Sequence, residues 1–307
     1  MKTYHIAVVG IGYIGVEHVK AISQNPRTIL RIMVGTDANW KRLEALKAEC
    51  AAEYISTDYQ AVLQDEQVDA VYLCTPNRLH ADQAVAALEA GKHVFCEKPM
   101  ATKLEDCRRM VAAVDRTGYQ LMVGHGARFQ PLQQAIKALY QEGKLGQACF
   151  CEADYVHPLD LMRWIVGELE EVSAYGTKKV LQQVEWQDTV IAILKFSHGA
   201  VGKCLVSVGA PRPYAMNFSL YGTEGTVENN KLFLKAFGQV ETFSEMPHSL
   251  LTEVHACVEE LEHFVQCLDQ GQLPLIDVRE GAKTVAACLA VAESLASGQT
   301  VKVITDF

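Results

Sequence analysis

A lysine at the end of an apolar segment is the most informative feature of this sequence. Residues 94–98 read Val-Phe-Cys-Glu-Lys, and Pro99 follows them. The apolar part has the length and composition of a buried strand. In open α/β sheets, ligands bind outside the carboxyl ends of the strands, so Lys98 and Glu97 are placed to contact a ligand. The plainer interpretation is a solvated lysine paired with Glu97.

A glycine-rich turn near the amino terminus predicts where a nucleotide binds. The apolar residues 4–9 lead into Gly-Ile-Gly-Tyr-Ile-Gly, and a helical pattern follows. This order of strand, G-x-G-x-x-G and helix is typical of dinucleotide-binding domains. The first glycine permits the tight turn, the second admits a pyrophosphate, and the third lets the helix pack on the strand. The predicted cofactor-binding residues here are Gly10, Gly12, Tyr13, Ile14 and Gly15. A βα turn without a cofactor is the structural alternative.

An acid after the second predicted strand indicates which dinucleotide binds. Asp37 follows the apolar residues 29–36 and lies about 20 residues after Gly15, where a ribose-binding acid is expected. Its carboxylate would accept hydrogen bonds from the ribose hydroxyls and repel a 2′-phosphate, so we predict NAD, with NADP less favoured. The nearby Lys41 and Arg42 would soften this preference. Alternatively, Asp37 caps the helix that follows.

The predicted strand at residues 70–74 ends in a segment that can line the same crevice. Thr75, Pro76 and Asn77 follow it, and His80 comes one helical turn later. Because this strand opens on the same edge of the sheet, we predict that these four residues wall the nicotinamide half of the cofactor. The structural alternative is that Pro76 begins a helix, Asn77 caps it, and His80 lies on the helix surface.

Strand and helix patterns alternate through the first part of the chain. Six predicted strands separated by helices indicate a doubly wound parallel sheet, that is, a Rossmann domain over residues 1–124. The fold class is therefore α/β, at least for this part.

Taken together, these motifs resemble those of the Gfo/Idh/MocA family, which includes glucose-fructose oxidoreductase and inositol dehydrogenase. The segments that carry the resemblance, over nearly the whole chain, are Gly10-x-Gly12-x-x-Gly15, Asp37, Thr75-Pro76-Asn77-x-x-His80, Glu97-Lys98-Pro99, Val123-Gly124-His125, Arg128-Phe129-x-Pro131 and Tyr221-Gly222-Thr223-Glu224-Gly225. The glycine motif is shared by many families, whereas the Glu-Lys-Pro segment in this context is far more specific.

The resemblance implies an NAD(P)-dependent oxidoreductase that acts on a secondary alcohol of a sugar, polyol or cyclitol, or on the corresponding ketone. It also implies that Lys98 is catalytic and contacts both cofactor and substrate, with Glu97 beside it at the cofactor. A cation next to the reacting hydroxyl would stabilise developing alkoxide charge. A non-catalytic dinucleotide sensor or regulatory protein on the same fold is the rival function. NAD-assisted elimination or glycoside cleavage is a third.

The second part of the chain changes to a pattern of strands. We expect an α+β domain over residues 125–307 with a largely antiparallel open sheet, because Ser197-His198-Gly199 and Asn229-Asn230 are hairpin signals. Amphipathic helices are predicted at residues 251–268 and 280–297. The resemblance implies that this sheet forms the contacts of a homodimer or homotetramer.

The resemblance also places a catalytic histidine in this part. Pro158 suits the start of a helix, and His157 and Asp160 lie three residues apart, so both can face one cleft. Matched to the family's catalytic helix, His157 is the general base and Asp160 binds a substrate hydroxyl. The structural alternative is a helix cap and its neighbour.

One departure from the family pattern lies just before His157. Family members carry an aspartate four residues before the histidine, after a loop of a few tens of residues, but here that position is Ala153, and Asp154 is one residue out of register. Two interpretations stay open. The chain has lost the loop and one catalytic acid, or the encoded protein has a loop between Val156 and His157 that the printed sequence lacks.

Composition limits the other possibilities. The net charge of −9 disfavours a nucleic-acid or anionic-membrane partner, and no apolar run is long enough to cross a bilayer. With no signal-peptide pattern after Met1, we expect a cytoplasmic protein. The ten cysteines are scattered, and the Cys149-x-Cys151 pair alone is too little for a zinc site, so we predict no metal.

Overall fold

The computed structural model describes residues 2–154, 158–211, 216–235, 242–251 and 255–307. The chain divides into two compact units. Unit 1 comprises residues 1–126, 255–285 and 307, and unit 2 comprises residues 127–254 and 286–306. The domain boundary that we place after residue 124 stays a prediction. Among the described helices, none combines the length and the apolar character that a bilayer span requires.

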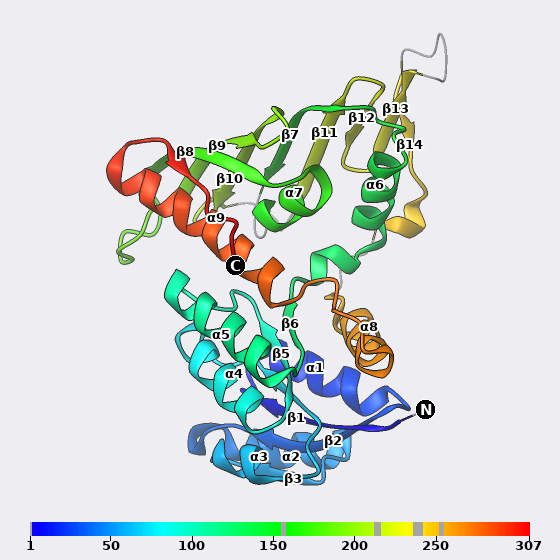
Figure 1. Cartoon of the computed structure of the whole chain (residues 1–307), viewed down its shortest axis with the longest axis vertical. Coiled ribbons are helices and arrows are strands. Elements are labelled where there is room, and N and C mark those ends of the chain that lie inside the picture. The colour runs from blue at the N-terminus through cyan, green and yellow to red at the C-terminus, as the bar shows by residue number, and fades with distance from the viewer. Residues whose placement is uncertain (1, 155–157, 212–215, 236–241, 252–254) are drawn as a thin grey trace. The chain divides into compact units, whose positions relative to one another are not determined.

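Unit 1 is built on a parallel sheet whose strand order is β3-β2-β1-β4-β5-β6 in the described residues (Figure 1). The strands are β1 (Tyr4–Val9), β2 (Thr28–Val34), β3 (Tyr54–Ser56), β4 (Ala70–Leu73), β5 (His93–Glu97) and β6 (Leu121–Gly124). The order reverses between β1 and β4, which is the point where doubly wound sheets bind ligands at their carboxyl edge. The predicted Rossmann fold is confirmed.

The helices of unit 1 pack on this sheet because apolar side chains repeat along them. They are α1 (Tyr13–Gln24), α2 (Trp40–Cys50), α3 (Gln60–Gln64), α4 (His80–Glu89), α5 (Leu104–Thr117) and α8 (Cys257–Gln270). Although α8 comes late in the sequence, it lies beside α1 (Figure 1). Tyr72 of β4 and Phe95 of β5 stack with ring centroids 4.4 Å apart, and Phe264 of α8 meets both rings edge-on. Aromatic burial therefore fixes α8 on the sheet.

Unit 2 contains a mixed sheet of strand order β14-β13-β12-β11-β7-β10-β9-β8-β15 in the described residues. The strands are β7 (Ala148–Asp154), β8 (Leu169–Thr177), β9 (Thr189–Phe196), β10 (Val201–Ser207), β11 (Asn217–Gly222), β12 (Gly225–Glu228), β13 (Lys231–Leu234), β14 (Ser244–Glu245) and β15 (Val301–Lys302). Only the β7–β10 pair among them is parallel. The predicted, largely antiparallel sheet is confirmed.

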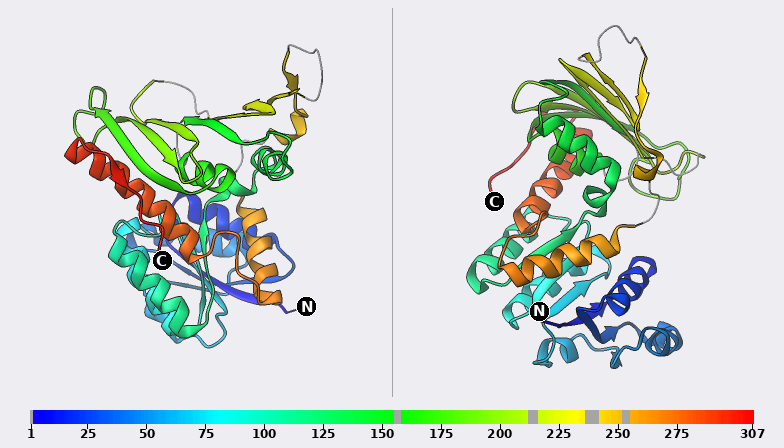
Figure 2. Two further views of the ribbon diagram at one scale, coloured as in Figure 1. Left: turned by 45° about the horizontal axis from the view of Figure 1, so that its top comes forward. Right: turned by 90° about the vertical axis from the view of Figure 1, so that its right-hand side faces the viewer.

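One face of this sheet carries the core of unit 2. The helices α6 (Pro131–Gln141) and α7 (Pro158–Val166), and the part of α9 (Val278–Ser297) after residue 285, contribute Ile136, Met162 and Ala287 to a cluster with the inward-facing strand residues. Figure 2 shows α7 and α9 on the same face of the sheet. Alternation along each strand then turns every second side chain to the opposite face.

One helix start and two short strands differ from the sequence-based expectation. The helix predicted from residue 251 begins at Cys257, because His248–Leu250 forms a separate 3₁₀ turn before it. The strands β13 and β14 were not predicted. Both are short, and β14 has only two residues, too few for an alternating pattern to be recognised.

Candidate functional site

The turn between β1 and α1 is built from glycines because larger residues would not fit. Gly10 has φ of +96°, and a Cβ there would lie 2.5 Å from the carbonyl oxygen of Cys74. A Cβ on Gly15 would lie 2.0 Å from the Gly10 carbonyl oxygen. By contrast, a Cβ on Gly12 would meet no described atom within 4 Å. Gly12 thus borders open space at the start of α1, where free backbone N–H groups favour a phosphate.

The two residues after Gly12 lie at the same opening. Tyr13 is largely exposed, and its ring meets the ring of His255 edge-on with centroids 5.7 Å apart. Ile14 is half-buried. Their predicted contact with the cofactor stays a prediction.

Asp37 lies in an exposed turn after β2 and is not used as a helix cap. The turn is closed instead by Asn39, whose Oδ1 accepts a hydrogen bond of 2.7 Å from the Thr36 N–H. The Asp37 carboxylate makes no hydrogen bond within the described ranges of the chain. An exposed carboxylate without a structural task fits the predicted ribose contact, and the alternative role as a cap is wrong.

The segment after β4 is tied to the Glu-Lys-Pro segment by His80. This histidine is 1% exposed, with Nε2 2.8 Å from the Thr75 carbonyl oxygen and Nδ1 3.0 Å from the Pro99 carbonyl oxygen. The alternative of a surface histidine is therefore wrong. Asn77 does not cap the helix either, since the cap position is Pro76 and no side-chain cap bond forms. Pro76 and Asn77 are exposed at the edge of the sheet.

Lys98 follows β5 with its ammonium group only weakly engaged. Its Nζ lies 4.0 Å from Glu97 Oε2, which is too long for a hydrogen bond, and its side chain is 30% exposed. Within the described parts of the chain this ammonium donates no hydrogen bond. The structure therefore presents, at the carboxyl edge of β5, a partly buried cation with its donors available to a ligand.

Glu97 points into the protein rather than into the opening. Its side chain is 8% exposed, and Oε1 lies 2.8 Å from His18 Nε2. Burial raises the pKa of Glu97, but the hydrogen bond from His18 and the charges of His18 and Lys98 outweigh it and bring the pKa below its usual value. Glu97 is therefore a buried carboxylate under Lys98. Its predicted contact with the cofactor stays a prediction.

Asp160 lies on α7 in a buried ion pair. Its Oδ2 and Oδ1 accept hydrogen bonds from Nε and Nη2 of Arg128, at 2.8 and 2.7 Å. Both side chains are nearly inaccessible, at 2% and 1% exposure. A carboxylate oxygen accepts more than one hydrogen bond, so the predicted substrate contact of Asp160 remains open as a prediction. His157, the predicted base, lies outside the described residues.

Two further cations hold α7 in place. Arg163 makes a two-point ion pair with Glu168, with bonds of 3.0 and 2.9 Å. The ammonium of Lys137, from α6, donates to the carbonyl oxygens of Trp164 and Ile165 at the carboxyl end of the helix. A cation there complements the helix dipole. The helix is thus fixed independently of any ligand, and its start at Pro158 agrees with the sequence.

The site residues thus fall into two groups. In unit 1 the structure places Gly10 to Gly15, Asp37, Thr75 to His80 and Glu97-Lys98 along one carboxyl edge of the sheet, and Asp160 belongs to unit 2. Sequence reasoning missed the partners of these residues. Arg128 lies within a motif segment, and His18 lies one helical turn after Gly15. The local spacing does not indicate that Arg128 pairs with Asp160 or that His18 pairs with Glu97.

Comparison with known proteins shows which family the two units resemble. A family model described as "Oxidoreductase family, NAD-binding Rossmann fold" matches residues 4–125, and one described as "Oxidoreductase family, C-terminal alpha/beta domain" matches residues 153–303. The scyllo-inositol 2-dehydrogenase (NAD(+)) of Bacillus subtilis is 26% identical, over 96% of this chain and 95% of the relative.

Two other relatives extend the comparison. An inositol 2-dehydrogenase of Rhizobium meliloti is 27% identical, over 98% of this chain and 99% of its own. That alignment runs over 335 positions, more than the 307 residues here, so the relative has stretches without a counterpart in this chain. The WlbA dehydrogenase of Bordetella pertussis, solved with NADH and UDP-GlcNAcA, is 27% identical with a TM-score of 0.85, covering 99% of this chain and all of the other.

The Arg128–Asp160 pair leads to a prediction about stability. Asp160→Ala leaves the Arg128 cation buried without its carboxylate, so we expect the free energy of unfolding in urea to fall by about 3–5 kcal/mol. Replacing both residues (Arg128→Met with Asp160→Leu) should cost less than Asp160→Ala alone. The control is Asp115→Ala, which removes the exposed pair with Arg279 and should cost less than about 1 kcal/mol. Equal losses for Asp115→Ala and Asp160→Ala would contradict a structural role for the buried pair.

Proposed function

Because this chain belongs to the Gfo/Idh/MocA family of oxidoreductases, we propose that it transfers a hydride between NAD and a secondary alcohol of a sugar, polyol or cyclitol. The two family matches span most of the chain and confirm the predicted family, the NAD-binding Rossmann domain and the oxidoreductase class. The relatives named above act on inositols, and a structural relative was solved with NADH. They support a polyhydroxylated substrate here.

The observation that carries the proposal is the ammonium of Lys98, which donates no hydrogen bond in the described residues. It stands at the carboxyl edge of β5 with its donors available, on the same edge as the open space at Gly12 and the unengaged carboxylate of Asp37. These features fit a dinucleotide: helix N–H groups for the pyrophosphate, an acid for the ribose and a cation near the reacting end. Bound NAD supplies the hydride acceptor.

Residues of the protein accept the hydroxyl proton and stabilise the charge that develops on the substrate oxygen. In the direction of oxidation, His157 accepts the proton of the substrate hydroxyl as the hydride leaves the same carbon. Lys98 donates a hydrogen bond to the substrate oxygen and stabilises its developing negative charge. Asp160 is proposed to orient a neighbouring hydroxyl. The reverse reaction returns the proton from His157 to the ketone oxygen.

Turnover of a panel of polyols, sugars and cyclitols with NAD tests the proposal. We expect Lys98→Ala to lower kcat by about 10²–10³-fold and His157→Ala by about 10²–10⁴-fold. Lys103→Ala, which removes an exposed lysine of the same unit, is the control and should keep the wild-type rate.

Three outcomes would contradict these assignments. If the wild type is active and both Lys98→Ala and His157→Ala retain full rate, the roles are wrong. If the wild type binds NAD tightly but oxidises nothing in the panel, the non-catalytic sensor becomes the better function. Product formation without net NADH would instead indicate elimination or glycoside cleavage.

Cofactor preference provides a separate test of Asp37. Asp37→Ser removes the charge that repels a 2′-phosphate, so the ratio of kcat/KM for NADP to that for NAD should rise by about 10- to 100-fold, equivalent to about 1.4–2.8 kcal/mol. Glu44→Gln on the exposed side of α2 removes a similar charge and should leave the ratio unchanged. An unchanged ratio in Asp37→Ser would assign the ribose contact elsewhere.

We also propose that the outer face of the unit 2 sheet joins copies of this chain into a homodimer or homotetramer. The face opposite to the core carries exposed apolar side chains, with Tyr175, Ile193 and Val201 each about half exposed or more, beside the ion pairs Lys195–Glu171 and Lys203–Glu152. Strand register puts them on one face: Tyr175 lies opposite Ile191 of β9, and Val201 lies opposite Lys195. Exposed apolar side chains on a sheet face, together with complementary charges, favour a protein contact.

The ten free cysteines support a reducing cytoplasmic location.

Sedimentation velocity tests the proposed assembly. We expect the wild type to sediment as a dimer or tetramer and Ile193→Glu, which replaces an exposed apolar side chain of this face with a carboxylate, to shift the species towards monomer. Leu273→Glu changes an exposed leucine of unit 1 and should leave the assembly intact. A monomeric wild type, or an assembly that survives Ile193→Glu, would rule out this interface.

A further inference from the structure

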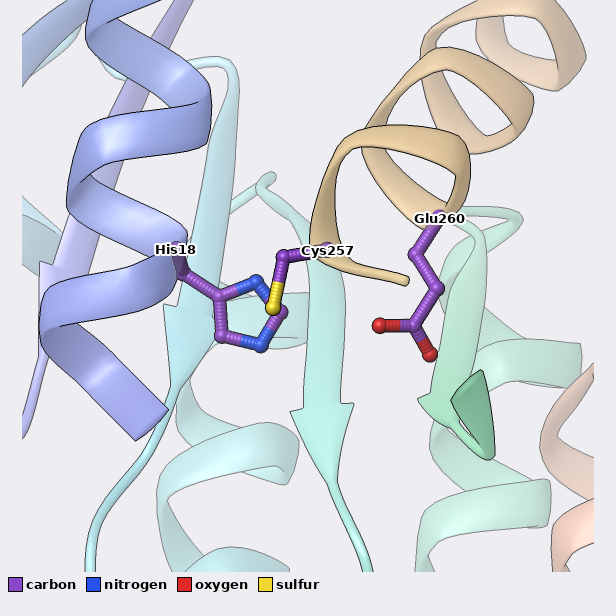
Figure 3. Close-up of side chains that lie close together, drawn as sticks. All are labelled: His18, Cys257 and Glu260. Atoms are coloured by element: carbon purple, nitrogen blue, oxygen red, sulfur yellow. The ribbon is translucent and has the colours of Figure 1, made fainter. Parts of the chain in front are cut away.

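Three buried side chains of unit 1 converge beside Glu97 without a role in the proposed reaction. His18 comes from α1, and Cys257 and Glu260 come from the first turn of α8. Each is at most 4% exposed. A ring nitrogen of His18, the sulfur of Cys257 and a carboxyl oxygen of Glu260 all lie within 4.8 Å of one another. Figure 3 shows the His18 ring reaching from α1 towards the two side chains on α8.

The local structure explains why these groups meet. Cys257 and Glu260 are three residues apart on a helix, which places them on the same face. His18 lies three residues after Gly15, whose close packing brings α1 onto the sheet. The phenyl ring of Phe264 anchors α8 over the same part of the sheet. Two helices distant in the sequence therefore present an imidazole, a thiol and a carboxyl group to one small volume.

The hydrogen bonds of the cluster leave ligand atoms unused. His18 Nε2 lies 2.8 Å from the Glu97 carboxylate and donates a hydrogen bond to it, so Nδ1 is the ring nitrogen left to bind a ligand. His18 Nδ1 and Glu260 Oε1 are both buried and have no hydrogen-bond partner in the described part of the chain. Buried polar atoms without partners are costly, and in native proteins they usually bind something.

We propose that His18, Cys257 and Glu260 form a binding site for a divalent transition-metal ion of the zinc type. Nitrogen, sulfur and carboxylate oxygen are the ligands that zinc takes. Around one ion at bond lengths of about 2.0–2.3 Å, ligand atoms are separated by about 3.4–3.7 Å, so a small rotation of the side chains from their present separation completes the site. Glu97 then acts as the carboxylate that orients a metal-bound histidine. The sequence had predicted no metal, because the three ligands are not close in the chain.

The ion would join α8 to α1. Burial raises the pKa of the Cys257 thiol, reinforced by Glu260 and Glu97, and burial together with Glu97 raises the pKa of the Glu260 carboxyl. The other charged groups that act on this pair are Lys98 and Glu259, with Glu17 near Cys257. A metal binds the thiolate and the carboxylate rather than their protonated forms, so binding displaces protons and the affinity falls as the pH falls.

Cobalt titration of the chelator-treated full-length protein tests the site. We expect one Co²⁺ per chain, a near-ultraviolet thiolate-to-cobalt charge-transfer band and release of protons into weakly buffered solution. Cys257→Ser should abolish the band, and Glu260→Gln should weaken binding by about 10- to 100-fold, a loss that even an outer partner of a metal site can cause. Cys149→Ser removes an exposed thiol and should keep both the band and the affinity.

Zinc content and stability complete the test. Zinc should displace the cobalt, and adding zinc to the chelator-treated wild type should raise its Tm, while Cys257→Ser should gain nothing from zinc. Circular dichroism of each variant checks that it is folded. A chelator-treated wild type that takes up no stoichiometric Co²⁺, or a charge-transfer band that persists in Cys257→Ser, would overturn the proposal.

Discussion

The site of unit 1 depends on one buried hydrogen bond, between His18 Nε2 and Glu97 Oε1. Glu97 itself is buried, and the His18 ring meets the stacked rings of Tyr72 and Phe95 edge-on. A carboxyl group in such surroundings would normally be neutral, because burial disfavours its charge. The His18 bond reverses this and keeps the carboxylate ionised. The negative charge in turn holds the Lys98 cation at the sheet edge without consuming its hydrogen-bond donors.

Through this hydrogen bond, the glycine motif also influences Lys98, which lies outside the proposed pyrophosphate site. Gly15 sets how closely α1 approaches the β1 turn, since a Cβ there would collide with the Gly10 carbonyl oxygen. His18 follows one turn later on the same side of the helix. A larger residue at Gly15 would therefore displace α1 and draw His18 away from Glu97. The motif has two tasks: it makes room for a pyrophosphate, and it fixes the histidine that keeps Glu97 charged.

Much of the fold, and of the carboxyl edge of the unit 1 sheet, could be predicted from local sequence patterns. Strands such as β1 and β4 are short apolar runs bounded by turn residues, and the glycine turn depends only on its neighbours, so both could be predicted from the sequence. The packing of α8 on the unit 1 sheet could not be predicted. Its apolar stripe predicts a helix, but a stripe does not say which surface it covers, and only the packing of Phe264 on Tyr72 and Phe95 decides this. The partner of Asp160 is likewise hidden, because Arg128 is distant in the sequence and pairs with it only in the folded chain.

The position before His157 where the family carries an acid can now be judged on physical grounds. Ala153 is 2% exposed on β7, opposite Cys204 and Phe218, and belongs to the core of unit 2. An aspartate at this position would bury a charge among apolar side chains at high cost. Asp154 cannot replace it, since successive residues of a strand face opposite sides. The side of β7 that carries Ala153 therefore has no room for the family's acid, and the three residues between β7 and α7 are Tyr, Val and His. Both interpretations of the departure, a lost loop and a loop missing from the printed sequence, concern this connection rather than the strand.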